Sequence, residues 1–540
     1  MSLRLTDQQR EQGQAEFKRA LGRSLTRRDF LRGLGAAAAV LPVSAAAYYG
    51  YTKLHGAPVK AALIGAGDEG GVLVGEHNPD YLEFVAYSDI RPSNQKRIFE
   101  GEERGPRKGF NRIYGTSAPQ KIKFFEDYRK LLELPYEECQ AVVIALPLHL
   151  HARVAIDALK AGKHVLCEKL MAWNVTQCKE MIRAADQYDR VLSIGHQRHY
   201  SLLYAHALEV LQSGELGEIR HIRALWHRNQ TWPRLDKDGK PMTEGNLPIL
   251  RDSWRPAIPK EDEAALRNRD LRPFGYKSLE ELVRWRLYHR TGGGLMAELG
   301  SHQLDACSIF LGKVHPLAVS GIGGKYFYDD DREVEDHVFC TFEFPGPNYW
   351  ADEAHTRVKD KNDKVIVTYS SLCTNGFEPY GECVMGNRGT LMVVSEQTAY
   401  FFPEPDPNAP AGGRETTATV SRAGGGQPAV DSYSSQPAAL EARGQAALGS
   451  GPVSRGYREE MEHFAYCVKL WDDKDVPKAE RPLPRCHGRV ALADAIVALT
   501  ANLAMRGRSG QGPERIEFQR EWFDASSPAV PDADMKEETL

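Results

Sequence analysis

The fold of this chain follows from two adjoining segments, VKAALI at residues 59–64 and GAGDEG at residues 65–70. The first segment is almost wholly apolar, which is typical of a buried parallel strand. The second has the spacing G-x-G-x-x-G, with Gly65, Gly67 and Gly70 at the fixed positions. These glycines permit a tight turn and let backbone N–H groups approach a pyrophosphate at the start of the next helix. A turn that needs glycine only for its own geometry would explain the three glycines equally well. The neighbouring sequence therefore has to show whether they form a dinucleotide site.

That context is an acidic residue after the next predicted strand. Residues 83–88 predict the strand, and Asp89 follows it, 22 residues after Gly67. A carboxylate at this place accepts hydrogen bonds from the ribose hydroxyls of NAD and repels the 2′-phosphate of NADP. Arg91, two residues further on, could instead accept a 2′-phosphate. The sequence therefore predicts a dinucleotide site with NAD as cofactor and leaves NADP open.

Strands and helices alternate through the first part of the chain. The predicted strands are 59–64, 83–88, 141–146, 164–167 and 191–194. The predicted helices between them include 151–161 and 176–188, the second capped by Asn174 or Thr176. Alternation of this kind predicts a parallel sheet with helices on both faces. We therefore expect an α/β Rossmann domain over residues 57–195.

The pattern changes after residue 200. A helix at 202–211 and a strand at 219–226 are followed by strands without intervening helices, at 317–322, 337–344, 364–369 and 390–394, and two helices close the chain, at 457–470 and 487–505. This predicts an α+β domain over residues 196–522 with a mostly antiparallel, open-faced sheet. Within it, residues 232–290 are polar and predict an insertion. Residues 404–455, rich in Pro, Gly, Ala and Ser, predict a disordered insertion, and residues 523–540 a tail.

The N-terminus carries an export pattern. SLTRRDFLR at residues 24–32 precedes an alanine-rich apolar stretch and small residues at which a peptidase can cut. A buried Ala-rich helix preceded by basic residues is the alternative. We expect residues 1–56 to be a twin-arginine signal and tether, with the twin-arginine translocase as partner. The protein would then lie in the periplasm or on the outer face of the cytoplasmic membrane, and the apolar stretch is long enough to be either cleaved or kept as an anchor.

Composition argues against several classes of site. The net charge of −4 offers no basic surface for nucleic acid. The nine cysteines include no C-x-x-C pair, and the seventeen histidines show no metal-ligand spacing with them, so neither a disulfide framework nor a metal site is expected. A chain of 540 residues is too long for one core, which favours two domains.

Two further segments give the chain a family resemblance. ALPLHLH at residues 145–151 is similar to the turn T-P-x-x-x-H-A of the Gfo/Idh/MocA oxidoreductases, and GKHVLCEKL at residues 162–170 is similar to their strand end G-K-H-V-x-x-E-K-P. The resemblance covers nearly all of residues 59–312 and returns weakly in the closing helices.

The resemblance implies roles for residues in both segments. It places Lys169 between nicotinamide and substrate, and it places four residues at the cofactor: Leu146, Pro147, His151 and Glu168. Leu170 stands where the family has a proline that is often cis. Without the resemblance, a lysine at a strand end would be typical of a solvated charge.

A third segment, TGGGLMAELGSHQLD at residues 291–305, carries the predicted acid and base. Glu298, His302 and Asp305 are spaced i, i+4, i+7, which places them on one face of a predicted helix at 294–311. A carboxylate one turn from a histidine can fix its tautomer, although a surface ion pair gives the same spacing. The family has G-G-G-x-x-x-D-x-G-x-H-x-x-D here. The resemblance implies that His302 is the general base and that Glu298, which replaces the usual aspartate, orients it.

Weaker candidates would edge a sugar pocket: Arg198, Tyr200, Trp226, Arg228 and Asp305. Packing and surface charge explain them equally well. His149 and His151 are expected to position a loop by hydrogen bonds.

Together these features predict an exported NAD(P)-dependent oxidoreductase that acts on a sugar or polyol CH–OH group. His302 would take the hydroxyl proton and Lys169 would polarise the same oxygen. Because free NAD is not expected outside the cytoplasmic membrane, the cofactor should be held tightly and a redox-neutral cycle is favoured. Two alternatives stay open: an NAD-dependent glycosidase acting through transient oxidation at C3, and a non-catalytic sugar-binding protein of the same fold. A homo-oligomer through the second sheet is expected.

Overall fold

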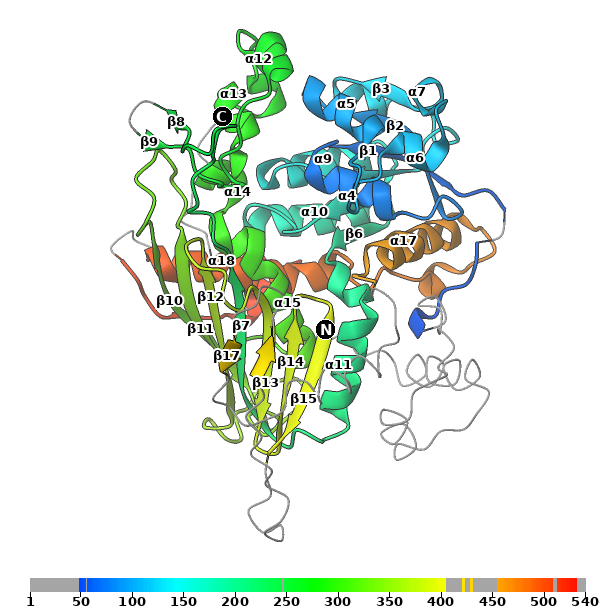
Figure 1. Cartoon of the computed structure of the whole chain (residues 1–540). Helices are drawn as coiled ribbons and strands as arrows, with labels where there is room; N and C mark the ends of the chain where they lie inside the picture. Colours follow the sequence, from blue (N-terminus) through cyan, green and yellow to red (C-terminus); the bar gives the residue numbers. More distant parts are fainter. Residues whose placement is uncertain are drawn as a thin grey trace.

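A computed structural model describes residues 48–54, 56–244, 247–404, 420–422, 428–430, 454–507 and 512–531 (Figure 1). The predicted signal up to residue 47 lies outside the described residues. So does the predicted disordered insertion, apart from two short paired strands, β16 (Val420–Arg422) and β17 (Pro428–Val430).

Six parallel strands form the first sheet, in the order β3-β2-β1-β4-β5-β6. Their bounds are β1 (Val59–Ile64), β2 (Leu82–Ser88), β3 (Lys123–Phe125), β4 (Ala141–Ile144), β5 (His164–Glu168) and β6 (Leu192–Gly195). The five predicted strands are thus confirmed, while β3 lacks the apolar run that would have predicted it. The order reverses between β1 and β4, and α/β proteins bind ligands beyond the carboxyl ends of the strands at such a point.

Helices cover both faces of this sheet (Figure 1). They are α4 (Asp68–Glu76), α5 (Pro92–Glu100), α6 (Phe110–Tyr114), α7 (Ala118–Lys121), α8 (Tyr128–Leu132), α9 (His151–Lys160) and α10 (Val175–Tyr188). Asn174 caps α10, since its side-chain oxygen accepts from the Gln177 N–H at 2.8 Å.

The second sheet has eight strands in the order β15-β14-β13-β7-β12-β11-β10-β18, antiparallel except for the pair β7–β12. Their bounds are β7 (Ile219–His227), β10 (Ala318–Gly324), β11 (His337–Pro345), β12 (Lys364–Leu372), β13 (Tyr380–Gly386), β14 (Gly389–Val394), β15 (Thr398–Pro403) and β18 (Ile516–Glu517). The predicted fold class is confirmed. The sequence did not predict β13, where Glu382 interrupts the apolar pattern because it is buried as the partner of an arginine.

Three helices pack on one face of the second sheet: α11 (Leu202–Gln212), α15 (Ser301–Phe310) and α18 (Gly488–Arg506). Among the described helices, α18 is the one long and apolar enough to cross a membrane, and 89% of its apolar window is buried inside the protein. It packs against both α10 and β10 and so joins the two domains. Ile322 and Phe339 pair on the opposite, open face and are about half exposed, at 53% and 40%.

Two segments from outside residues 57–195 complete the Rossmann core. Helix α17 (Tyr457–Asp472) packs against β1, β2 and β6, and the N-terminal Tyr49 and Tyr51 are buried beside it. The Tyr51 hydroxyl donates to Glu462 Oε2 at 2.8 Å. The described part of the chain therefore begins at Tyr48, and Tyr49 and Tyr51, within the stretch predicted to be a tether, pack into the Rossmann core.

The predicted insertion at residues 232–290 folds into a wall beside the Rossmann domain (Figure 1). It contains β8 (Thr243–Glu244), β9 (Leu247–Pro248), α12 (Lys260–Leu266) and α13 (Leu279–Val283), and α14 (His289–Gly292) follows it. Arg269 of this wall pairs with Glu126, which follows β3, at 2.6 Å. The wall thereby closes one side of the space above the parallel sheet.

Candidate active site

A cavity of about 560 Å³ lies between the carboxyl ends of the parallel strands and the second domain. The predicted site residues that line it are Gly65, Gly67, Asp89, Arg91, Leu146, Pro147, His151, Glu168, Lys169 and Glu298. The sequence thus predicted most of the sheet side of the cavity.

The insertion supplies the other side of the cavity, which the sequence did not predict. Trp254, Trp285 and Arg286 line it there. They stand in no motif, and the tryptophans in an otherwise polar stretch were the one signal that could have identified them.

The three glycines of the turn after β1 are required for different reasons. Gly65 has a φ of +98°, and a Cβ on it would lie 2.3 Å from the Ala145 carbonyl oxygen. A Cβ on Gly70 would lie 2.2 Å from the Gly65 carbonyl oxygen. Gly67 differs, because the nearest described atom to its Cβ would be Asn94 Nδ2 at 3.9 Å. Packing within the protein does not require glycine there, whereas a pyrophosphate approaching the N-terminus of α4 does.

Three donors hold the Asp89 carboxylate at the edge of the cavity. Oδ2 accepts from the Ala66 N–H at 2.8 Å and from Asn94 Nδ2 at 3.1 Å, and Oδ1 accepts from the Arg91 N–H at 2.8 Å. Burial raises the pKa of Asp89, and the hydrogen bonds from Arg91 and Ala66 oppose the rise. A carboxylate fixed beside the glycine-rich turn fits the predicted contact with ribose hydroxyls.

The first turn of α4 contains two acidic residues, Asp68 and Glu69. Two unpaired carboxylates there would repel a pyrophosphate. Asp68, however, pairs with Arg97 Nη1 at 2.8 Å. Burial raises the pKa of Glu69, although Lys169 opposes the rise, and this favours the neutral carboxyl. Lys96 and Arg97 also line the cavity as cations. The surroundings of α4 therefore fit a pyrophosphate.

Lys169 lies at the end of β5, where the sequence placed it. Its Nζ donates to the Glu298 carbonyl oxygen at 2.8 Å, and the peptide between Lys169 and Leu170 is cis. Burial and the nearby Glu69 raise the pKa of the adjacent Glu168 well above its ordinary value. The Lys169 ammonium thus joins the Rossmann sheet to the segment that precedes α15.

The predicted contact between Glu298 and His302 is wrong. Met296–Gly300 is a π-helix that runs into α15, and the i→i+5 bonds of a π-helix widen the turn. Residues four apart therefore no longer lie directly above one another. The Glu298 carboxylate instead accepts from Arg286 Nε at 2.7 Å, and His302 Nδ1 has no hydrogen-bond partner in the described part of the chain. Burial would raise the pKa of Glu298, but Arg286 and Lys169 outweigh it and hold that pKa below its ordinary value.

His302 is not among the residues that line the cavity, and it is 8% exposed. Its ring centroid is 5.5 Å from that of Trp226. Burial lowers the pKa of His302 well below its ordinary value, and the charges of Lys169 and Arg198 lower it further. The imidazole is therefore neutral near pH 7 and able to accept a proton.

Arg198, predicted to contact substrate, lies in the core and is 2% exposed. Its guanidinium donates to Glu382 Oε1 at 3.0 Å and to Glu396 Oε1 at 2.6 Å. Nη1 also donates to the His302 carbonyl oxygen at 2.6 Å. The structure thus makes Arg198 a support for the helix that carries His302.

Tyr200 and Asp305 are likewise core residues that do not line the cavity. The Tyr200 hydroxyl pairs with His463 Nδ1 at 2.9 Å. Asp305 accepts from His199 Nε2 at 2.8 Å and from Lys313 Nζ at 2.5 Å. Their placement corrects the prediction that they edge the substrate pocket, because sequence spacing alone does not distinguish a buried ion pair from a ligand.

Trp226 and Arg228, the other two weak candidates, lie together at the Glu298 side of the site. Trp226 stacks on Tyr380 with ring centroids 4.6 Å apart, and the Arg228 guanidinium lies 5.0 Å from the Trp226 ring centroid. Burial and the neighbouring Arg286 lower the pKa of Arg228, while Glu298 opposes this. Neither residue lines the cavity, and Tyr380 and Arg228 contact the Trp226 ring, so the structure does not place this pair at the edge of a substrate pocket.

The two loop histidines position backbone, as predicted. His149 Nε2 lies 3.0 Å from the Gly275 carbonyl oxygen in the insertion. His151 Nδ1 and Nε2 each lie 2.8 Å from a carbonyl oxygen, of Leu170 and Leu146 respectively. His151 thus ties the loop after β4 to the loop after β5.

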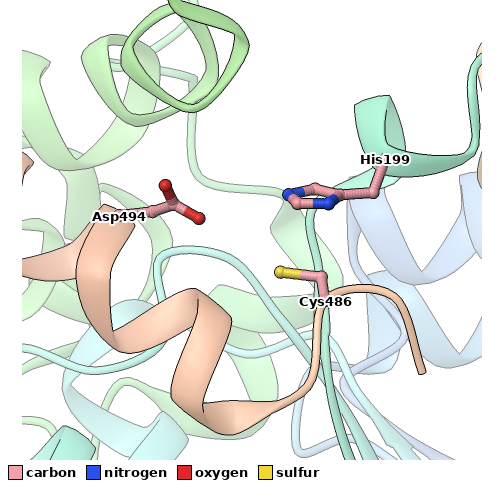
Figure 2. Close-up of side chains that lie close together, drawn as sticks. All are labelled: His199, Cys486 and Asp494. Carbon is pink, nitrogen blue, oxygen red and sulfur yellow. The ribbon is translucent and has the colours of Figure 1, made fainter. Parts of the chain in front are cut away.

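A separate group of possible metal ligands, His199, Cys486 and Asp494, lies in the core with ligand atoms within 4.8 Å of one another (Figure 2). Lys313 Nζ already lies 3.0 Å from Asp494 Oδ1 and 2.5 Å from Asp305. Burial also raises the pKa of the Cys486 thiol well above its ordinary value. This group fits a lysine-centred charge network better than a cation site.

Two family models match the chain. Residues 59–196 match the model described as "Oxidoreductase family, NAD-binding Rossmann fold", and residues 271–370 match the "GFO/IDH/MocA C-terminal domain". The predicted resemblance is therefore confirmed for both segments, and the first domain is an NAD-binding Rossmann domain of an oxidoreductase family.

Solved structures share the fold over most of the chain. An inositol dehydrogenase homolog from Azotobacter vinelandii, complexed with NADH and myo-inositol, gives a TM-score of 0.53 at 16% identity, over 86% of this chain and 98% of that chain. An aldose-aldose oxidoreductase from Caulobacter crescentus, complexed with glycerol, gives 0.51 at 17% identity, over 85% of this chain and 100% of that chain. At these identities the likeness shows the fold alone.

Curated relatives match over part of the chain. Inositol 2-dehydrogenase of Salmonella typhimurium is 30% identical over 114 residues, which are 21% of this chain and 33% of that protein. An uncharacterized oxidoreductase of Rhizobium meliloti is 34% identical over 118 residues, which are 22% of this chain and 31% of that protein. The chain therefore spans about a third of the length of these relatives.

The glycine-rich turn makes a direct prediction. Gly67→Val places a branched side chain in free space at the cavity, so the protein should fold but should bind NAD about ten- to a hundredfold more weakly, as expected for steric overlap. Isothermal titration with NAD measures this. Gly67→Ala, which is smaller, should lose less, and an unchanged affinity in Gly67→Val would contradict the assigned position of the pyrophosphate.

Proposed function

We propose that this chain, which contains segments of both domains of the GFO/IDH/MocA oxidoreductases, transfers a hydride between NAD and a CH–OH carbon of a sugar or polyol. The observation that carries the proposal is the position of Lys169. It lines the same cavity as Gly67 and Asp89, and its ammonium donates to the backbone of the segment that leads to His302. The myo-inositol and glycerol named in the related structures support a polyhydroxylated substrate.

Each residue of this site has one task. Bound NAD would supply the acceptor for the hydride of the carbinol carbon. The Lys169 ammonium is placed to donate to the substrate oxygen and to stabilise negative charge as it develops there. His302 is neutral and takes the hydroxyl proton, either directly or through one water.

Glu298 is a positioning residue in this proposal. Its carboxylate holds Arg286 of the insertion at 2.7 Å, and its carbonyl oxygen accepts from Lys169. Glu298 therefore connects Arg286, in the insertion, with Lys169, at the end of β5 in the Rossmann domain.

We also propose that the enzyme acts outside the cytoplasmic membrane. The support is the pattern SLTRRDFLR at residues 24–32 and the alanine-rich apolar stretch that follows it. Export of a folded protein would carry the dinucleotide with it, so a tightly held cofactor and a redox-neutral cycle follow from this location.

The base assignment predicts a defect in chemistry without a defect in binding. His302→Ala should retain NAD, because the glycine-rich turn and Asp89 lie in the other domain. Single-turnover reduction of bound NAD should fall about a hundredfold or more, the usual contribution of a positioned base. Lys169→Ala should fall similarly, and the double variant should be little worse than either.

His206→Ala is the matched control, since His206 lies on α11 and its side chain is 37% exposed. It should keep the wild-type rate. If His302→Ala also reduces its cofactor at the wild-type rate, the helix is structural and His302 is not the base.

The lowered pKa of His302 sets the pH dependence. The base must be neutral, and burial together with Lys169 disfavours its protonated form. Activity should therefore persist as the pH falls through about 6.5, the ordinary histidine value, and should be lost only below it. A profile of kcat/KM against pH measures this, and an acidic limb centred above that value would argue against a buried, neutral His302.

The export proposal depends on the two adjacent arginines. Arg27→Lys together with Arg28→Lys preserves charge but removes the guanidinium pair, so the protein should accumulate in the cytoplasm. Cell fractionation and immunoblotting test this. Normal yield of the double variant outside the membrane would show that the pattern is not the signal.

A further inference from the structure

Helix α12 of the insertion reaches across the cavity to the first turn of α5. Asp262 of α12 is fully buried, and its carboxylate accepts three hydrogen bonds from the Rossmann domain. Arg91 Nε donates to Oδ2 at 2.8 Å, and the Ser93 N–H and hydroxyl donate at 2.9 Å to Oδ1 and at 2.7 Å to Oδ2. This carboxylate is completely enclosed although it lies between two domains.

The donors around Asp262 are those that recognise a phosphate monoester. A guanidinium, a hydroxyl and a backbone N–H at the start of the nine-residue helix α5 converge on the Asp262 carboxylate. They follow directly on Asp89, the residue placed to hold the adenosine ribose. Arg91 and Ser93 also line the cavity. A 2′-phosphate on that ribose would need these same donors.

Arg91 therefore already has in Asp262 the anionic partner that a phosphate would have to replace. Its backbone N–H donates to Asp89 and its side chain to Asp262, so carboxylates take both. A 2′-phosphate entering here would have to displace Asp262 or share the site with two negative carboxylates.

We propose that Asp262 fills the place of the 2′-phosphate and makes this chain select NAD over NADP. The sequence left the choice open because Arg91 could have served either cofactor. Asp262 decides it from a part of the chain about 170 residues away, by pairing with the guanidinium that follows the ribose-binding Asp89 most closely in the sequence. The proposal rests on the dinucleotide site and not on the substrate or the reaction.

A binding experiment with the full chain tests the proposal. The dissociation constants of NADH and NADPH are measured by fluorescence titration for the wild type and for Asp262→Ala. The wild type should prefer NADH, and Asp262→Ala should bind NADPH at least about tenfold more tightly than the wild type does, while NADH changes much less. Adding Arg91→Ala to Asp262→Ala should abolish the gain.

Two further variants keep the result interpretable. Asp262→Asn preserves the shape of the side chain and removes its charge, so it should shift the preference in the same direction if Asp262→Ala fails to fold. Glu263→Gln, on the exposed side of α12, should change neither constant. A wild type that binds NADPH as tightly as NADH, or Asp262 variants whose two constants change by the same factor, would overturn the proposal. A wild type that binds neither nucleotide would instead refute the dinucleotide site itself.

Discussion

The active site depends on one steric constraint: no side chain fits where the turn after β1 meets the end of β4. A Cβ on Gly65 would lie 2.3 Å from the Ala145 carbonyl oxygen. The φ of Gly65 is also in the left-handed region, which favours glycine over residues with a side chain. This close approach sets the start of α4 beside the loop that begins at Leu146. It also brings the Ala66 N–H within 2.8 Å of Asp89. The cavity exists because these backbone segments meet without side chains between them.

The second domain completes the site by reaching back over the first. Lys169 contacts the backbone of the π-helix, and Asp262 contacts the start of α5, so both ends of the cavity are bridged. Helix α18 lies beneath and packs on both domains. These contacts hold the two domains around the cavity without a covalent link.

Sequence periodicity predicted the elements that bury apolar faces, and motifs predicted the residues whose spacing is fixed by backbone geometry. Gly65, Asp89 and Lys169 are such residues, and the structure places all three at one cavity. Glu298 shows the limit. Its i, i+4 spacing to His302 places the two side chains on one face only if the segment is an α-helix. A single π turn removes that alignment, and no residue type in the sequence predicts such a turn. Long-range partners such as Arg286 lie in the insertion, where no local pattern shows which side chains will face the cofactor domain.

The central claim is that this cavity is a redox site and not only a binding site. The most direct test loads the full chain with NAD and records the near-ultraviolet absorbance of reduced nicotinamide while a panel of polyols and aldoses, including myo-inositol, is added. The account predicts that at least one member of the panel reduces the bound cofactor stoichiometrically. Stoichiometric NAD binding with no reduction by any member would contradict it and would favour a sugar-binding protein that keeps the fold without the reaction.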